Sequence, residues 1–323
     1  MSAPETLAIE TRDLSKTYRL GFWMNKRVLA LQGLTLSIHP GQVYGLLGPN
    51  GAGKSTTIKI LMNLVQATSG TAHIFGHEPD AKEARRNVGF LPENPAPYEY
   101  LTGEEFVRLA GQLVGLSGHE LDKRVKEVLG AVGMSRTAGL QIRRYSKGMV
   151  QRVGLAQAIV GKPKLLILDE PTSGLDPVGR REIRDLILQE REQGTTVLFC
   201  THIIPDVEAL CNRVAVLVNG KQAREGSVQE LLTAQVPLVE LTIEGLTPDT
   251  LRGLGHPLEQ VQDLTNRVLV RAGDAHVQPL LKSVLNAGGR VTQLQPARFS
   301  LEELFLQAMS EAKHGTVGGE IQS

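Results

Sequence analysis

The run Gly48-Pro49-Asn50-Gly51-Ala52-Gly53-Lys54-Ser55-Thr56 matches the pattern G-x-x-x-x-G-K-[ST] of a phosphate-binding loop. Glycines in such a loop let successive backbone N–H groups point at phosphate oxygens, where side chains would collide. The pattern assigns Lys54 to the outer phosphates and the hydroxyl of Ser55 to Mg²⁺. We therefore predict that a nucleoside triphosphate is bound by Gly48, Asn50, Gly51, Gly53, Lys54, Ser55 and Thr56.

The sequence on both sides of this loop has the pattern that the loop requires. Gln42–Leu47 is an apolar run with strand character, and Thr56–Leu64 has the pattern of a helix. Strand, loop and helix in this order form the setting of a phosphate-binding loop. The helix would also direct the positive end of its dipole at the bound anion.

A strand that ends in two acidic residues follows the phosphate loop by about a hundred residues. Lys164–Leu168 is almost wholly apolar, as expected of a strand at the centre of a parallel sheet, and it ends in Asp169 and Glu170. We expect Asp169 to hold Mg²⁺ and Glu170 to polarise a water molecule for in-line attack on the γ-phosphate. The alternative is two acids that face solvent at a strand end, and the phosphate loop upstream favours the first interpretation.

Length and composition restrict the class of protein. The chain has 323 residues, which suggests two domains, and 41% of them are hydrophobic and 21% charged, as in globular proteins. The formal net charge of +1 gives no global field that would favour nucleic acid, so no nucleic-acid partner is expected. No apolar run approaches the roughly 18 residues that cross a bilayer. No secretory signal is visible in the first ten residues, and Cys200 and Cys211 lack metal or redox spacing, which together favour the cytosol.

The order of predicted elements indicates an α/β fold. Strands alternate with helices up to about residue 226, which favours a parallel sheet. After that point the pattern is β-α-β-β-α-β with a terminal helix, a ferredoxin-like α+β order. The predicted divisions are a nucleotide-binding domain (1–226) with a helical subdomain (about 94–160), a linker helix (227–236), a C-terminal accessory domain (237–311) and a disordered tail (312–323).

Five motifs in fixed order carry a resemblance to a known family. They are the phosphate loop, Tyr145-Ser146-Lys147-Gly148-Met149, Leu165–Glu170, Ser173-Gly174-Leu175-Asp176 and Thr201-His202. Over about residues 7–226 the chain resembles the ATP-binding cassette of ABC transporters. The resemblance implies a phosphate-loop NTPase cassette with a parallel-sheet core and a helical subdomain, ATP and Mg²⁺ as cofactors, and ATP hydrolysis as the activity.

The same resemblance implies roles for single residues in one subunit. Tyr18 would stack on adenine, and the alternative is a packed tyrosine at a strand end. His202 would contact the γ-phosphate and hold the attacking water together with Glu170, so these two residues are the catalytic candidates. A lone histidine at a strand end is more often structural, so this role depends on the place of His202 in the series.

The resemblance also implies that some residues of one cassette act on the ATP site of a second cassette in a dimer. The family pattern implies that Ser146 and Gly148 bind the ATP of the opposite subunit and that Asp176 acts across the dimer interface. The plainer alternatives are that Ser146 only caps its helix and that Asp176 with Pro177 only makes a turn. A complete site would therefore need a homodimer or a second ABC cassette.

The chain departs from the commonest family pattern in two places. Lys147 stands in a signature whose widespread form is Leu-Ser-Gly-Gly-Gln, and it adds a positive charge near the expected phosphates. Glu93 stands where the family has glutamine; either side chain offers an oxygen to Mg²⁺, and Glu93 is therefore a third candidate metal ligand beside Ser55 and Asp169. Both departures, and the segment 299–306, resemble a branch of bacterial exporter ATPases.

Residues 20–27 form an insertion that contains Trp23, the only tryptophan. One interpretation is an apolar and basic contact with a membrane subunit or lipid headgroups, and the other is a loop packed on its own domain.

The resemblance implies an ATP-hydrolysing subunit that powers transport, with export favoured, through a separate integral membrane permease. It would lie in the cytoplasm, peripherally on the inner face of the cell membrane. One alternative is a soluble ABC ATPase that acts on ribosomes or DNA, although the chain has neither two cassettes nor long coiled-coil insertions. Another is a phosphate-loop kinase or GTPase, which would not need Ser146-x-Gly148 before the acidic strand.

Overall fold

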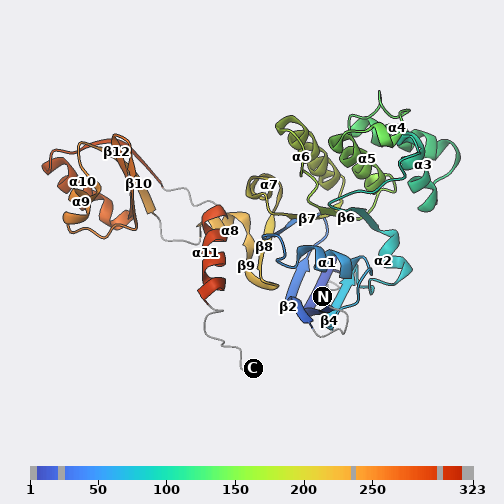
Figure 1. Cartoon of the computed structure of the whole chain (residues 1–323), viewed down its shortest axis with the longest axis horizontal. Coiled ribbons are helices and arrows are strands. Elements are labelled where there is room, and N and C mark those ends of the chain that lie inside the picture. Colours follow the sequence, from blue (N-terminus) through green and yellow to red (C-terminus); the bar gives the residue numbers. More distant parts are fainter. Residues whose placement is uncertain (1–5, 21–25, 234–237, 297–300, 315–323) are drawn as a thin grey trace, which may run out of the picture. The chain divides into compact units, whose positions relative to one another are not determined.

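The protein is described by a computed structural model, which covers residues 6–20, 26–233, 238–296 and 301–314. The chain divides into two compact units, labelled by element in Figure 1. The first contains the described residues through Val228 together with those from Phe305 onward, and the second is Gln229–Leu304. The insertion around Trp23 lies outside the described residues.

A six-stranded sheet forms the centre of the first unit, in the order β5-β6-β7-β3-β8-β9. Five neighbouring strands are parallel, and β9 runs antiparallel to β8. Every residue of β3, β6 and β7 is buried, which is why these strands are apolar throughout. The predicted parallel-sheet core is confirmed. The strands are β3 (Val43–Leu47), β5 (Val88–Leu91), β6 (Leu165–Asp169), β7 (Thr196–Thr201), β8 (Arg213–Val218) and β9 (Lys221–Ser227).

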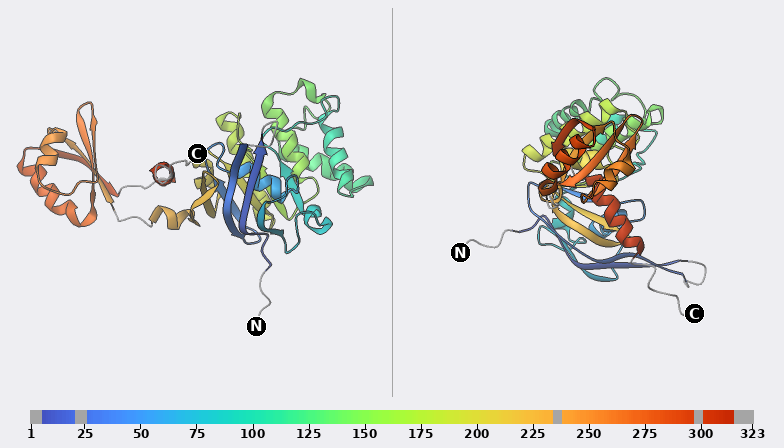
Figure 2. Two further views of the ribbon diagram at one scale, coloured as in Figure 1. Left: turned by 60° about the horizontal axis from the view of Figure 1, so that its bottom comes forward. Right: turned by 90° about the vertical axis from the view of Figure 1, so that its left-hand side faces the viewer.

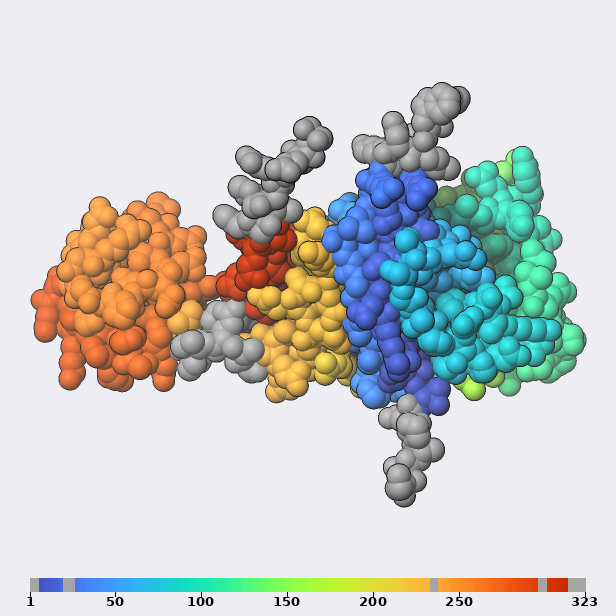
Figure 3. Space-filling view, turned by 90° about the horizontal axis from the view of Figure 1, so that it is seen from below, coloured from blue at the N-terminus to red at the C-terminus, as the bar shows by residue number. Residues whose placement is uncertain are grey.

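A smaller antiparallel sheet packs beside the first, in the order β2-β1-β4. Its strands are β1 (Ile9–Leu20), β2 (Lys26–Ile38) and β4 (Ser69–Ile74), drawn in blue in Figure 2. One buried core includes Leu14 and Leu34 of this sheet and Tyr44 and Leu46 of the parallel sheet. Seen from below in Figure 3, the blue residues of the antiparallel sheet form a continuous face beside the cyan segment. Burial of apolar area between the two sheets therefore holds the phosphate-loop side of this unit together.

Helices surround the parallel sheet, and those between residues 94 and 160 form the predicted helical region. Thr102 begins that region with a capping box: its Oγ1 accepts from the Glu105 amide (3.2 Å), and the Glu105 carboxylate accepts from the Thr102 amide (2.8 Å). The helices are α1 (Lys54–Leu61), α2 (Lys82–Arg86), α3 (Gly103–Leu113), α4 (Gly118–Ala131), a 3₁₀ turn (Ile142–Arg144), α5 (Lys147–Ile159), α6 (Pro177–Glu192) and α7 (Ile204–Leu210).

The second unit has the predicted ferredoxin-like order. Its antiparallel sheet runs β11-β12-β10-β13, and Leu241, Val270 and Leu280 are fully buried in its core. The elements are β10 (Leu238–Glu244), α9 (Pro248–Gly253), β11 (Gln260–Leu264), β12 (Arg267–Gly273), α10 (Asp274–Asn286) and β13 (Arg290–Pro296).

Two helices lie near the division between the units: α8 (Val228–Thr233) and α11 (Leu301–His314). The predicted accessory domain extends to residue 311, but the structure divides α11, and the part from Phe305 onward belongs to the first unit. There Arg224 of β9 donates to both carboxylate oxygens of Glu311 (2.9 and 2.8 Å), and Ala308 is buried. Residues 312–314, predicted to be disordered, continue this helix; 315–323 and the predicted linker residues 234–236 lie outside the described residues.

In the described part of the chain, no helix is both long enough and apolar enough to cross a bilayer.

Candidate nucleotide site

The phosphate loop lies between β3 and α1, as its strand–loop–helix pattern predicts. It borders a pocket of about 450 Å³ that also reaches the acidic end of β6. The pocket is lined by Tyr18, Val28, Leu29, Ala30, Asn50, Gly51, Ala52, Gly53, Lys54, Ser55, Thr56, Glu93, Asp169 and Glu170. Six of the seven predicted loop residues, the proposed adenine contact and all three candidate metal ligands therefore share one cavity.

Two glycines of the loop have no room for a side chain. Gly53 has a φ of 110°, and a Cβ atom there would lie 2.7 Å from Leu31 Cδ2 and 2.8 Å from the Ala30 carbonyl oxygen. A Cβ atom on Gly48 would lie 2.6 Å from the Leu217 carbonyl oxygen. These close approaches give the physical reason for glycine at both positions of the motif.

Lys54 is buried at the start of α1, with a relative exposure of 5%. Its ammonium group donates to the carbonyl oxygens of Gly48 (2.7 Å) and Pro49 (3.3 Å), and it lies 3.7 Å from Glu170 Oε1. The ammonium group is thus held between loop carbonyls and a carboxylate. It also lines the pocket, where it can bind the phosphate oxygens of a ligand.

Asp169 ends β6 and is almost completely buried. Burial raises the pKa of its carboxyl group to about 6, with the charges of Glu170 and Glu93 adding to the rise and a hydrogen bond from Ser55 opposing it. Its Oδ1 atom is buried and has no hydrogen-bond partner in the described part of the chain. A buried carboxylate oxygen without a donor fits a ligand atom for a hard cation such as Mg²⁺.

The other two candidate metal ligands border the same pocket as Asp169. In the described residues no three or more His, Cys, Asp or Glu side chains are grouped as a metal cluster. The two ligands beside Asp169 are Ser55 and Glu93, and Glu93 is exposed. The remaining ligands would be phosphate oxygens and water, as is usual for Mg²⁺ at nucleotide sites.

Glu170 is held at the end of β6 by three side chains. Its Oε1 lies 2.8 Å from His202 Nδ1, and its Oε2 accepts from Thr201 Oγ1 (3.0 Å). Lys54 is the third partner. Glu170 also has a φ of 51°, which non-glycine residues rarely adopt and which is concentrated at functional sites. His202 is half-exposed, so the pair joins a buried carboxylate to an accessible imidazole.

Tyr18 lies on β1 and borders the pocket. It pairs with Val28 of β2, and the Lys16 ammonium lies 5.1 Å from the centre of its ring. Val28 and Leu29 are exposed apolar side chains that border the same pocket. These two residues were not predicted as part of the site, although they directly follow the insertion at residues 20–27 that begins two residues after Tyr18.

Five predicted site residues do not line this pocket in the described part of the chain: Gly48, His202, Ser146, Gly148 and Asp176. Gly48 begins the phosphate loop, and His202 is bound to Glu170, which does line the pocket. Ser146 is the N-cap of α5 and accepts from the Met149 amide (3.3 Å), and Asp176 is the N-cap of α6 and accepts from the Gly179 amide (2.7 Å). Within one chain both side chains therefore act as helix caps.

The signature and the Ser173–Asp176 segment contact each other within the chain. A Cβ atom on Gly148 would lie 3.2 Å from Leu175 Cδ2, and one on Gly174 would lie 2.9 to 3.1 Å from Cε, Cδ and Nζ of Lys147. Gly174 has a φ of 74°, so its backbone conformation favours glycine, whereas the exposed end of the Lys147 side chain could move aside.

Comparison with known proteins identifies the family. A model of the ABC transporter family matches residues 31–173. An ABC transporter ATP-binding protein of Nostoc sp. (strain PCC 7120) is 39% identical over 305 residues, which cover 94% of this chain and 90% of that protein. The chain belongs to the ABC transporter ATP-binding proteins. As an ABC ATPase it binds and hydrolyses ATP.

Two further relatives of this ABC ATPase carry informative names. The daunorubicin/doxorubicin resistance ATP-binding protein DrrA of Streptomyces peucetius is 39% identical over 235 residues, which cover 72% of this chain and 68% of DrrA. A solved structure, the dimeric post-hydrolysis state of the ATP-binding cassette MJ0796 bound to ADP and Pi, is 28% identical. It matches with a TM-score of 0.63 over 68% of this chain and 98% of that one.

Proposed function

We propose that this ABC ATPase powers export through a separate integral membrane permease, from the cytoplasmic face of the cell membrane. The Glu170–His202 pair beside the phosphate loop is the observation that carries the hydrolytic part of this proposal. The name of DrrA as a drug-resistance protein supports export. Lys147 in the signature and Glu93 in place of glutamine resemble the branch of bacterial exporter ATPases, which also supports export.

The positions of the side chains support a role for each residue in this proposal. Gly48, Asn50, Gly51, Gly53, Lys54 and Thr56 bind the phosphates, and Tyr18 stacks on adenine. Glu170 accepts the proton of the attacking water, and His202 holds that water beside the γ-phosphate. Ser55 and Asp169 would hold Mg²⁺, with Glu93 as a further ligand, directly or through water. When bound, Mg²⁺ offsets the charge that develops on the transferred phosphoryl group.

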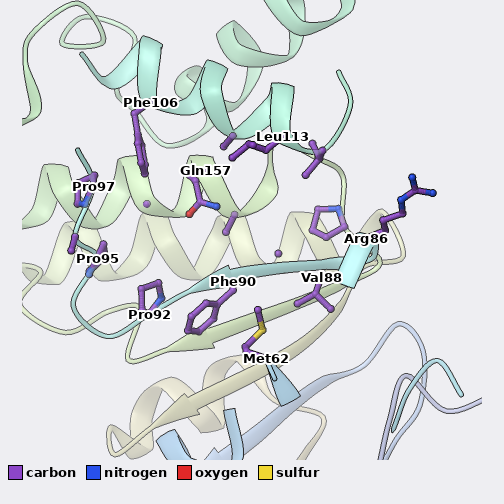
Figure 4. A pocket seen from close by; sticks show the side chains of 18 residues that line it. Met62, Arg86, Val88, Phe90, Pro92, Pro95, Pro97, Phe106, Leu113 and Gln157 are labelled. Carbon is purple, nitrogen blue, oxygen red and sulfur yellow. The ribbon is translucent and has the colours of Figure 1, made fainter. Parts of the chain in front are cut away.

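A second pocket supplies a surface for the permease (Figure 4). It has a volume of about 460 Å³ and lies among β5, α3 and α5. Phe90, Pro95 and Phe106 give it apolar walls, and Pro92 also lines it. Glu93, the next residue after Pro92, lines the nucleotide pocket. Two consecutive residues thus border the two pockets, and we propose that an apolar segment of the permease binds here and responds to the nucleotide through this connection.

A second cassette completes the ATP site in this proposal. Ser146, Gly148 and Asp176 lie outside the nucleotide pocket of their own chain, and MJ0796, a cassette of the same family, is a dimer in its ADP- and Pi-bound structure. We propose that the N-terminus of α5 binds the γ-phosphate of ATP held by a second copy, or by another ABC cassette. ATP then closes the dimer, and hydrolysis reopens it.

Purification of tagged chain from detergent-solubilised membranes, with mass spectrometry of its partners, tests the transport role. We expect a polytopic membrane protein in near-equal amount. Leu113 lines the second pocket and is 80% exposed, so Leu113→Asp should abolish co-purification of that partner. Leu285 is 61% exposed on the second unit, and Leu285→Asp should leave the partner bound. Co-purification of ribosomal or DNA-repair proteins instead would favour a soluble ABC ATPase.

A further inference from the structure

A buried carboxylate lies near the hydrolytic pair but outside the nucleotide pocket. Asp206 lies in the first turn of α7, and its relative exposure is 2%. We infer that Asp206 is a positioning residue for ATP hydrolysis, which holds the turn that carries Glu170 against the helix that follows His202. This inference depends on the proposed role of Glu170 as the base.

The turn in question begins at Glu170. The Glu170 amide donates to the Cys200 carbonyl oxygen (2.9 Å), and its carbonyl oxygen accepts from the Ser173 amide (3.1 Å). The chain thus leaves β6 and reverses immediately, with Glu170 at a φ of 51°. A residue in this backbone region is kept there only when its surroundings hold it.

Thr172, inside this turn, anchors the turn to α7. Its side chain is fully buried, and its Oγ1 donates to Asp206 Oδ2 at 2.6 Å. The other carboxylate oxygen of Asp206 lies 3.6 Å from Nη1 of Arg184 on α6. Both oxygens of this buried charge thus have a partner, one of which belongs to the turn.

Two connections therefore join the same pair of segments. Glu170 is bound at its side chain by Thr201 and His202, and its turn is bound two residues later through Thr172 and Asp206. His202 and Asp206 are four residues apart on the segment that leaves β7. A displacement of this segment by about 1 Å would take the carboxylate and the imidazole out of hydrogen-bond geometry. The anchor thus sets the distance between the two catalytic candidates.

Thr172→Val tests the anchor with little change in shape, because only the hydroxyl donor is replaced. We expect kcat for ATP hydrolysis by the full chain to fall at least tenfold while the dissociation constant for ATP changes less than twofold. Thr172→Ser keeps the donor and should restore kcat to within about threefold of the unaltered protein. An unchanged kcat in Thr172→Val, or a loss that Thr172→Ser does not restore, would overturn the inference.

A double variant separates positioning from general stability. If Thr172 and Asp206 act through Glu170, adding Thr172→Val to Glu170→Gln should leave the small residual rate unchanged. A further tenfold fall in the double variant would show an effect independent of Glu170 and would contradict the positioning role. If Glu170→Gln alone keeps full activity, the assignment of Glu170 as base is the one that fails, and the positioning role is overturned with it.

Discussion

The carboxylate of Glu170 lies 2.8 Å from Nδ1 of His202, at the point where two neighbouring parallel strands end. Glu170 lines the pocket that contains the phosphate loop, and its Oε1 lies 3.7 Å from the Lys54 ammonium. Side chains from three segments far apart in the sequence thus meet beside the phosphate loop.

Glu170→Gln should keep ATP binding and lose hydrolysis. The amide cannot accept the proton of the attacking water, so we expect the rate to fall about 10²–10⁴-fold. ATP should then hold the protein as a dimer, which size-exclusion chromatography with ATP would detect. Glu192→Gln, at the exposed end of α6, is the matched control and should hydrolyse ATP normally. A fall below about tenfold, or ~1.4 kcal/mol, would exclude Glu170 as the base.

His202→Ala should slow hydrolysis by about 10²-fold, because Glu170 loses its partner and the water loses a contact. ATP affinity should change little, since His202 is not part of the pocket lining in the described residues. Phosphate release measured at saturating ATP gives the rate. His119, an exposed residue of α4, provides the control, because His119→Ala should leave turnover unchanged. Normal turnover in His202→Ala would contradict the proposed role.

Lys54→Ala should weaken ATP binding at least about 100-fold, because the charge that faces the outer phosphates is removed. The same change leaves Asp169 and Glu170 without a nearby cation. Equilibrium binding of a fluorescent ATP analogue measures the effect. Lys59→Ala, exposed on the same helix, should bind normally; equal affinities of the two variants would be incompatible with the loop assignment.

Alanine substitutions at two glycines of the phosphate loop distinguish the cost of backbone strain from the cost of steric collision. Gly51 has a φ of 82° with open space around it, so Gly51→Ala should cost only the backbone strain, about 1 kcal/mol of unfolding free energy. Gly53→Ala adds contacts of 2.7 and 2.8 Å with Leu31 and Ala30, and should cost about 2–3 kcal/mol more. Denaturant unfolding of the full chain compares the two. Equal losses would mean that the neighbours of Gly53 move aside freely.

Ala308→Asp should destabilise the packing of α11 on the first unit. Ala308 is buried, so the carboxylate enters a site without water, at a cost of about 2 kcal/mol or more. Leu306→Asp, on the same helix but 60% exposed, should change stability by less than about 0.5 kcal/mol. Thermal unfolding with bound ATP analogue provides the comparison. Similar melting temperatures would show that this helix contributes little to the first unit.

Several features were predictable because each depends on a short stretch of sequence. Strand, loop and helix around Lys54, the buried strand before Asp169 and the β-α-β-β-α-β order after residue 226 all follow from local apolar pattern and turn residues. The order of the five motifs predicted the family. Asp169, Glu170 and most of the phosphate loop line one pocket, together with Val28, Leu29 and Ala30, which no motif indicated. The structure then confirmed the parallel sheet, whose strand ends bring Asp169 and the phosphate loop to one edge.

Other features depend on contacts between distant residues. Nothing in the local pattern indicated that Thr172 would bind Asp206, 34 positions later, or that the part of α11 from Phe305 onward would join the first unit through Arg224 and Glu311. Such contacts are selected by the packing of whole elements.

The sequence by itself determined which chemical groups this ABC ATPase has and which backbone segments carry them, because glycine freedom, apolar pattern and helix caps act over a few residues. Only the tertiary structure decided their separations, such as the 2.8 Å between Glu170 and His202, and the placement of Ser146 and Asp176 away from the chain's own pocket. The reason is that strand pairing and core packing, which bring these segments together, are sums over many distant contacts.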